Sequence, residues 1–434
     1  MTKTSSDMTS PTFLAPGAPD VDSSKLRGTV VHPDFDFEDS NVVLAVTGSP
    51  IAQTLELYME PTEIEKAEIE NSTKTPGAVT TLFKVHVFQI SRHSDVLSNM
   101  LGRSETVGTP TCTVDGLPVI ELNDDPLDIF NLLNLVYNSD ILPALPFRQE
   151  TFNTMSSILR LAPKYNLTRL APIAKRRIQE EWPREIDGWD RNEKHLSAMC
   201  EWNALVRQTD DVEQHPGEEV DIIEPCAAIR LGTDSGMPEI LPAAFYHLSR
   251  LSPIYDRVHR SQNDLVGYQR SQSYWLDGGR SADREILSSQ DFEKLYIGKG
   301  EIRNWVEDFM DLGWKSEHLL DCSGADLECA AMSVGWRIYW SREIEPMIVQ
   351  LLCEDGMDVL EWLRSTQGRV GEDGQLCSGC CSQIREAIGL ARKTFWRSLP
   401  KFFGLKRPKF WGGLWKEEAV NYGTEVSVSW QTAI

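Results

Sequence analysis

Four cysteines are spaced in a way that could bind zinc. Cys322 and Cys329 form a Cys-x6-Cys pair, and Cys377 and Cys380 form a Cys-x2-Cys pair. Zinc takes four donors in a tetrahedron, and a Cys-x2-Cys turn presents two thiolates at once. The first spacing is loose, however, and Cys381 adjoins the second pair. Because cysteine is also a common small residue of buried cores, a structural role for these thiols is the alternative.

A second pattern with possible chemistry is Gly-Thr-Asp-Ser-Gly at residues 232–236, which is superficially similar to the loop around a serine-protease nucleophile. The flanking segments have helical periodicity and cannot supply the β-barrel and oxyanion geometry of such a protease. A loop between two helices explains the glycines better. Since no His, Cys, Ser or carboxylate cluster has the spacing of a known chemistry, we expect no catalysis and no cofactor, with zinc as the possible exception.

The segment 382–416 combines basic and aromatic residues, a combination that can bind nucleic acid or acidic membranes. Its basic residues include Arg385, Arg392, Lys393, Arg397, Lys401, Lys406, Arg407 and Lys409. The whole chain is acidic, with 43 Lys and Arg against 65 Asp and Glu and a net charge of −22. Such a balance repels polyphosphates over most of the surface. We therefore favour a basic surface that pairs with the acidic remainder, and expect nucleic acid to be an unlikely partner.

Composition also predicts where the chain works. The first twenty residues lack the basic-then-apolar pattern of a signal peptide, and no apolar run approaches the ~20 residues that span a bilayer. We expect no membrane association and an intracellular location, in the cytoplasm or the nucleus. The nine cysteines are then thiols or metal ligands rather than disulfides.

The 434 residues predict two or three domains. Residues 1–28 are rich in small polar residues and are expected to be a disordered tail. The expected order after it is a domain at 29–183 with an acidic insertion at 47–80, a helical extension at 184–260, a linker or loop at 261–286, a helical C-terminal domain with the Cys pairs at 287–404, and a tail at 405–434. In the C-terminal domain we expect Ser288 or Ser289 to cap a helix that carries Trp305, Phe309 and Trp314 as core residues.

The first half of the 29–183 domain reads as strand, insertion, strand and two short helices. The β-branched run 42–46 predicts a strand, and its partner should be residues 82–85. The glutamates of the insertion indicate a short acidic surface helix or a mobile loop. Two short helices follow, separated at residues 92–94, and Ser94 is placed to cap the second.

The second half of this domain reads as a strand and three helices. Gly116 turns the chain into a strand at 117–122, and Asp125 with Pro126 starts a helix. The expected apolar stripes of the three helices are Leu127, Phe130, Leu133 and Tyr137; Phe152, Met155, Leu159 and Ala162; and Leu167, Leu170, Ala174 and Ile178. Three narrow stripes against a small sheet predict an α+β fold.

Four ordered pieces of this domain resemble BTB/POZ domains, in particular the divergent BTB proteins of fungi. They are HPDFDFEDSNVVLAV, LFKVHVFQISRHSDVLSNML, VIELNDDPLDIFNLLNLVYNSDILPALPF and FNTMSSILRLAPKYNLTRLAPIAKRRIQEEWP. The resemblance implies a BTB/POZ fold, a small sheet flanked by helices, followed here by a mainly α-helical C-terminal region. It also implies homo- or hetero-dimerisation and recruitment of protein partners, among them cullin-type ubiquitin ligases or transcriptional co-repressors, without catalysis.

Two positions of the resemblance concern one site. His86 matches the near-invariant histidine of the family, which implies a buried structural histidine. Asn41 stands where many members have Asp before the first strand, which removes a charge expected near His86.

The sequence thus predicts a protein-protein interaction module that dimerises or recruits partners. One alternative is a substrate adaptor of a cullin-type ubiquitin ligase, although no hydrophobic-x-Glu adaptor signature follows the three helices. The other alternative is a zinc-containing, DNA-binding transcriptional regulator that uses the Cys pairs and the basic segment.

Overall fold

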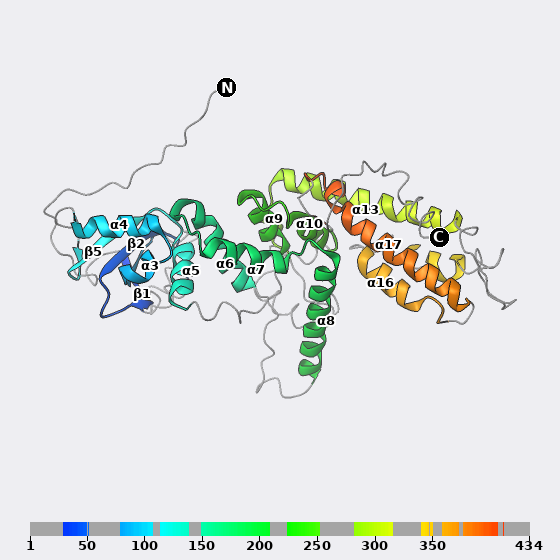
Figure 1. Ribbon diagram of the computed structural model, residues 1–434, viewed down its shortest axis with the longest axis horizontal. Helices are drawn as coiled ribbons and strands as arrows, with labels where there is room; N and C mark the ends of the chain where they lie inside the picture. Colours follow the sequence, from blue (N-terminus) through cyan, green and yellow to red (C-terminus); the bar gives the residue numbers. More distant parts are fainter. Residues whose placement is uncertain are drawn as a thin grey trace, which may run out of the picture. The chain divides into compact units, whose positions relative to one another are not determined.

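The computed structural model describes residues 29–49, 51, 79–106, 113–138, 149–208, 224–251, 282–315, 340–346, 348–349, 358–372, 376–406 and 411. The chain forms two compact units (Figure 1). The first comprises Met1–Pro146 and Glu150–Arg177, and the second Phe147–Gln149 and Ile178–Ile434. The expected N-terminal tail, most of the acidic insertion, most of the 261–286 linker and most of the 405–434 tail lie outside the described residues. Within the 405–434 segment Trp411 is described, and its side chain is fully buried and stacked on Trp396.

A five-stranded mixed sheet is the centre of the first unit. Its strands are β1 (Thr29–Asp36), β2 (Val42–Gly48), β3 (Val79–Val85), β4 (Thr113–Val114) and β5 (Leu117–Leu122), in the order β1-β3-β2-β5-β4. β2 pairs with β3 in antiparallel register, Val42 opposite Val85, and with β5 in parallel. The predicted pairing of 42–46 with 82–85 is therefore confirmed. Together with the helices around it, the sheet confirms an α+β fold, while the BTB/POZ fold itself stays a prediction.

Strand β1 was not predicted, and it pairs in parallel with β3 at the edge of the sheet. The register breaks between Val31 and Asp36, around Pro33, which has no N–H to donate to a ladder. Within this break the His32 side chain is fully buried, with its ring 4.8 Å from that of Phe130 and stacked on Phe83. An aromatic contact therefore anchors the strand where its ladder is interrupted.

Five helices accompany this sheet: α3 (Val87–Ser91), α4 (Asp95–Thr106), α5 (Pro126–Tyr137), α6 (Gln149–Tyr165) and α7 (Leu170–Glu181), the last of which ends in the second unit. The predicted break between α3 and α4 is confirmed. Ser94 caps α4 as expected, because its hydroxyl oxygen accepts from the Leu97 N–H at 3.0 Å. The same hydroxyl donates to the Tyr165 carbonyl, which fixes the start of α4 to the end of α6.

Helix α5 confirms its predicted start and corrects its predicted face. Asp125 accepts from the Leu127 N–H at 2.8 Å, and Pro126 is the first helical residue. The Leu127 side chain, however, is 45% exposed, so its place on the buried stripe was wrong. The reason is that α5 is covered on most sides, where its buried apolar residues are Ile129, Phe130, Leu132, Leu133, Leu135 and Val136. A helix enclosed in this way has no single apolar stripe for the period to reveal.

The predicted apolar stripe of α6 is only half correct, whereas the stripe of the following helix is correct. In α6, Phe152 and Met155 are buried, but Leu159 and Ala162 are only half-buried. Ile158 and Leu161, one position earlier along the chain, take their places in the core. All four residues predicted for the last stripe, from Leu167 to Ile178, are buried and confirmed.

The described residues of the second unit are mainly helical. The helices are α8 (Ile186–Gln208), α9 (Pro225–Asp234), α10 (Leu241–Ser249), the 3-10 turn η5 (Arg284–Ile286), α13 (Ser289–Lys315), the π-helical turn η7 (Trp340–Ile344), α16 (Val359–Arg369) and α17 (Ser378–Phe402). Helix α17 packs against α16 and α13, and α10 against α9 (Figure 1). No helix among the residues that the structure describes is long and apolar enough to cross a bilayer.

The predicted cap and the predicted aromatic core residues of α13 can be compared with the structure. Ser288, one of the two candidates, caps α13: it accepts from the Asp291 N–H, and the Asp291 carboxylate accepts from the Ser288 N–H at 3.0 Å. Trp305 and Phe309 are buried and stacked with centroids 5.4 Å apart, as expected of core residues. The side chain of Trp314 lies outside the described residues.

The glycine-rich segment 232–236 is only partly a loop. Gly232 lies inside α9, where a Cβ would approach Leu241 Cδ2 to 2.7 Å, so the placement of this glycine in a loop was wrong. The absence of a side chain there lets α9 and α10 pack closely. Gly236 has a φ of +66° and belongs to the turn between them.

Candidate functional site

His86, the candidate structural histidine, lies between β3 and α3 and contacts two other segments of the first unit. Its Nε2 is 3.1 Å from Asp39 Oδ1, and its Nδ1 is 2.9 Å from the Tyr137 hydroxyl. That hydroxyl also accepts from the backbone N–H of His86 at 2.8 Å. A hydroxyl has one proton and two acceptor lone pairs, so it can contact the His86 backbone N–H and the ring nitrogen at the same time. The ring joins the turn before β2, the start of α3 and the end of α5.

The expected environment of His86 needs two corrections. The side chain is 24% exposed, so it is half-buried rather than fully buried. Asn41 does not leave the histidine without a neighbouring carboxylate, because Asp39 supplies one. The Asn41 side-chain oxygen instead accepts from the Val87 N–H at 2.8 Å and so satisfies the first backbone donor of α3.

An aromatic side chain stands out from the helix that this cluster positions. Phe88, in the first turn of α3, is 68% exposed, and Leu127 is the other large apolar side chain that the described part of the first unit exposes. The Arg92 guanidinium lies 5.7 Å from the centroid of the Phe88 ring, within the range of a cation-π contact. Val96 and Met100 on α4 are partly exposed. We call Phe88, Arg92, Val96 and Met100 the α3–α4 surface.

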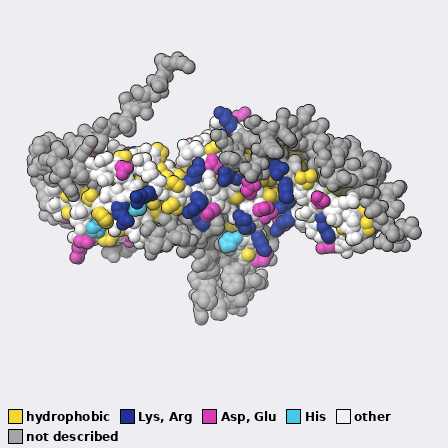
Figure 2. Space-filling view, viewed as in Figure 1, with side chains coloured by type: hydrophobic (Ala, Val, Ile, Leu, Met, Phe, Trp, Pro, Cys, Tyr) yellow, Lys and Arg dark blue, Asp and Glu magenta, His cyan; other side chains and the backbone are white. Residues whose placement is uncertain are grey.

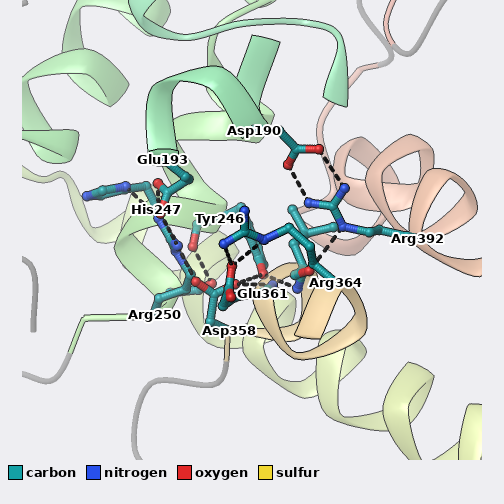
Figure 3. A network of polar contacts seen from close by, with 11 residues as sticks. Asp190, Glu193, Tyr246, His247, Arg250, Asp358, Glu361, Arg364 and Arg392 are labelled. Carbon is teal, nitrogen blue, oxygen red and sulfur yellow. Dashed lines mark hydrogen bonds and ion pairs between the residues drawn. The ribbon is translucent and has the colours of Figure 1, made fainter. Parts of the chain in front are cut away.

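The second unit contains a buried polar network around Arg250 (Figure 3). The Arg250 side chain is 4% exposed, and its two terminal nitrogens donate to the Glu193 carboxylate at 2.9 and 3.1 Å. It also forms an ion pair with Asp358, and its Nη2 lies 2.8 Å from His247 Nδ1. The guanidinium carbon lies 4.7 Å from the Trp189 ring centroid, so the cation is enclosed by an aromatic face as well as by carboxylates.

Tyr246 and Asp358 extend this network to the start of α16. The Tyr246 hydroxyl donates to Asp358 Oδ1 at 3.0 Å and accepts from the Leu360 N–H at 3.0 Å. Asp358 is the N-cap of α16 and accepts from the Glu361 N–H at 3.1 Å. The network therefore satisfies the free backbone donors of a helix terminus.

A second ion pair lies beside this network. The Arg392 guanidinium on α17 donates with both terminal nitrogens to the Asp190 carboxylate on α8, one of these bonds being 2.6 Å long. Its Nε donates to the Leu360 carbonyl at 3.0 Å. Arg392 and Arg250 thus join α8, α10, α16 and α17 (Figure 3).

The protonation states in the network point to a structural role. Burial alone would lower the pKa of Arg250, but the carboxylates of Asp358 and Glu193 raise it above the ordinary value. Burial raises the pKa of Tyr246 well above its ordinary value. Arg250 therefore stays cationic and Tyr246 stays protonated, and neither can serve as a general base near neutral pH. Their contacts hold four helices together.

The four predicted zinc ligands are only partly placed. Cys377 is the N-cap residue of α17 and is half-buried, while Cys380 is fully buried in the first turn of that helix. Cys322 and Cys329 lie outside the described residues. Over the ranges that the structure does describe, no three His, Cys, Asp or Glu side chains come together in a way that could hold a metal ion. The four-cysteine site stays a prediction.

The basic segment is partly internal. Arg392 pairs with Asp190, and Arg385 donates to the Val370 carbonyl at 2.7 Å. These contacts support pairing with other parts of the chain at these two positions. Arg407 and Lys409 lie outside the described residues. On the face shown in Figure 2, basic and acidic side chains of the described residues are interspersed.

Sequence reasoning missed the Arg250 network. One signal was available, because Arg250 is the only Lys, Arg, Asp or Glu in the apolar segment ILPAAFYHLSRL, near its end. A charged residue at the end of a buried helix needs a partner of opposite charge. The partners, Glu193 and Asp358, are 57 and 108 residues away, and no spacing rule identifies them.

No protein-family model, curated protein or solved structure matches this chain. The BTB/POZ assignment therefore rests on the four sequence pieces quoted above.

Proposed function

We propose that this chain is a non-enzymatic protein-binding protein, and that its first unit dimerises through the α3–α4 surface. The observation that carries the proposal is Phe88, an aromatic side chain 68% exposed on a helix with a firmly held start. Dimerisation is also what the resemblance to BTB/POZ domains implies.

The α3–α4 surface has the composition of a contact site. Aromatic residues, methionine and arginine are enriched at protein interfaces, where a few of them carry most of the binding free energy. Phe88 and Arg92 lie one helical turn apart, with Met100 on the next helix. Removing an apolar side chain from water contributes about 25 cal/mol per Å² of buried area, so covering Phe88 favours association.

The surface is also fixed in place before any partner arrives. Asn41 binds the first N–H of α3, His86 joins that end to Asp39 and Tyr137, and Ser94 caps α4. A contact surface that is ordered beforehand loses less conformational entropy on binding. The contacts of the half-buried His86 with Asp39 and Tyr137 thus hold the helix that exposes Phe88.

Sedimentation velocity of the full chain tests this proposal. We expect self-association that weakens at least tenfold on Phe88→Glu, because the substitution places a charge in the apolar contact. Leu127→Glu is the matched control: it makes the same kind of change at the other exposed apolar residue, in a helix first turn where an acidic side chain is favourable. It should leave the dimer unchanged.

Two results would contradict the proposal. One is a wild-type chain that stays monomeric at high concentration. The other is a Phe88→Glu chain that dimerises as well as the wild type while its circular dichroism shows intact folding.

A further inference from the structure

We propose that the second unit carries a separate self-association surface on helix α13, where α13 of a second copy packs in antiparallel orientation. The exposed face of α13 begins with three large apolar side chains: Phe292 is 43% exposed, Tyr296 82% and Ile297 48%. The opposite face is buried against α10 and α17, where Gly298 lies against the Phe403 ring. The exposed face therefore belongs to a helix that its own core holds in place.

Six of the exposed residues of α13 form a regular seam, and Phe292 and Ile297 lie on either side of it. Ser289, Glu293, Tyr296, Gly300, Arg303 and Glu307 are all exposed and follow each other at alternating spacings of four and three. This is the spacing with which a helix contacts another helix along a narrow stripe. We call these six residues the α13 seam.

The seam is complementary to itself. A two-fold axis that crosses the seam at the level of residue 298 along the helix places Tyr296 opposite Gly300 of the second copy, and each such pair occurs twice. A Cβ built at Gly300 would meet nothing within 4 Å, so the surface there is open. The aromatic ring of one copy can lie over the bare backbone of the other. Tyr296 and Gly300 lie at equal distances from the axis, so the ring of each copy faces the glycine of the other.

Charge selects the same arrangement. The axis that pairs Tyr296 with Gly300 also places Glu293 opposite Arg303 of the second copy, whereas a parallel pair would put Glu293 opposite Glu293. Among the described residues of its own chain, Arg303 pairs with Glu307 at 3.3 Å, and both side chains are exposed. Pairs of this kind contribute little, so the guanidinium can turn to a new carboxylate. In a chain of net charge −22, local pairs of opposite sign are needed to align two copies.

Charge reversal on the full chain tests the inference. The variants are made in the Phe88→Glu background, so that association through the α3–α4 surface is removed and the two surfaces are measured apart. We expect Glu293→Arg alone and Arg303→Glu alone to raise the dissociation constant of the remaining dimer about tenfold, since each brings like charges together. The double reversal restores opposite charges and should return the constant to within about threefold of its starting value.

Asp308→Arg provides the matched control, because it reverses an exposed charge of the same helix outside the seam. It should leave the dissociation constant unchanged. Tyr296→Ser should weaken the dimer without the possibility of rescue by charge.

Each surface can fail alone. A Phe88→Glu chain that is monomeric at every concentration overturns the α13 inference and supports the α3–α4 proposal. Failure of the double reversal to restore association also overturns the inference. If Phe88→Glu has no effect on association while the α13 reversals abolish it, the α13 surface stands and the α3–α4 proposal falls.

Discussion

The guanidinium of Arg250, one residue beyond α10, forms an ion pair with the carboxylate of Asp358, which caps α16. The same cation binds Glu193 on α8. These three residues are separated by 57 and 108 positions in the chain. One side chain therefore joins three helices that no local interaction would bring together.

Replacing Arg250 should destabilise the second unit strongly. Arg250→Met keeps an apolar stem of similar length but leaves Glu193 and Asp358, whose side chains are 17% and 26% exposed, without their cation. Breaking a buried pair by removing one partner leaves a poorly solvated charge. We expect the free energy of unfolding to fall by about 3 kcal/mol, measured by urea denaturation followed by tryptophan fluorescence.

Arg364 provides the control for that experiment. It pairs with Glu361 three residues away, and both side chains are about half exposed, at 47% and 51%. Arg364→Met should lower the free energy of unfolding by less than about 1 kcal/mol. Equal effects of the two substitutions would show that burial of the Arg250 network does not matter.

Two glycines of α13 should respond in opposite ways to alanine. A Cβ at Gly298 would overlap the ring of Phe403, which is fully buried and stacked on Phe245 at 5.3 Å. Gly298→Ala should lower the free energy of unfolding by about 1–3 kcal/mol, as overpacked cores do. Within its own chain Gly300→Ala meets open space, and at concentrations where the chain is monomeric it should raise the free energy of unfolding by up to about 1 kcal/mol through helix propensity. A stabilised Gly298→Ala chain, measured by thermal unfolding, would contradict the close packing of α13.

His93 should make the first unit sensitive to mild acid. Burial, together with the charges of Arg92 and Arg169, lowers the pKa of His93 below its ordinary value. The unfolded chain therefore takes up this proton first, at about pH 6.5, and protonation favours unfolding. The contribution of His93 to stability is complete above that pH and declines as the pH falls towards the folded-state pKa.

His93→Gln removes this proton uptake and should flatten the melting temperature between pH 7.5 and 5.5 relative to the wild type. His195→Gln, at an exposed position of α8, controls for the loss of a histidine as such. A His93→Gln chain with the same pH profile as the wild type would exclude the effect.

Local signals in the sequence predicted the helix starts well. The caps at Ser94, Asp125 and Ser288 each use a donor or acceptor within three residues, so the pattern alone contains the interaction. The β2–β3 pairing was predicted for a related reason. Each strand has a short, largely apolar run of its own, at 42–46 in β2 and at 82–85 in β3.

The features that could not be predicted depend on distant residues. Strand β1 contains Pro33, which lies where its ladder with β3 is interrupted, so its residues do not present one continuous strand pattern. Leu127 has the right period for a core residue, but the packing around α5 leaves it in water. Arg250 was visible as a lone charge, and its partners were not. The candidate surface at Phe88 depends on exposure, which periodicity does not measure.

The antiparallel ladder of β2 and β3 begins by pairing Gly48 with Val79 and so closes the segment 49–78. The entropy lost on closing a flexible loop grows only with the logarithm of its length. For closure entropy alone, a four-residue connection would cost ~2 kcal/mol less than thirty residues, and sixty residues would cost only ~0.6 kcal/mol more. Seven residue pairs, from Val42 with Val85 to Gly48 with Val79, fix the register independently of that length. The register of the two strands therefore does not depend on the length of the segment that they close.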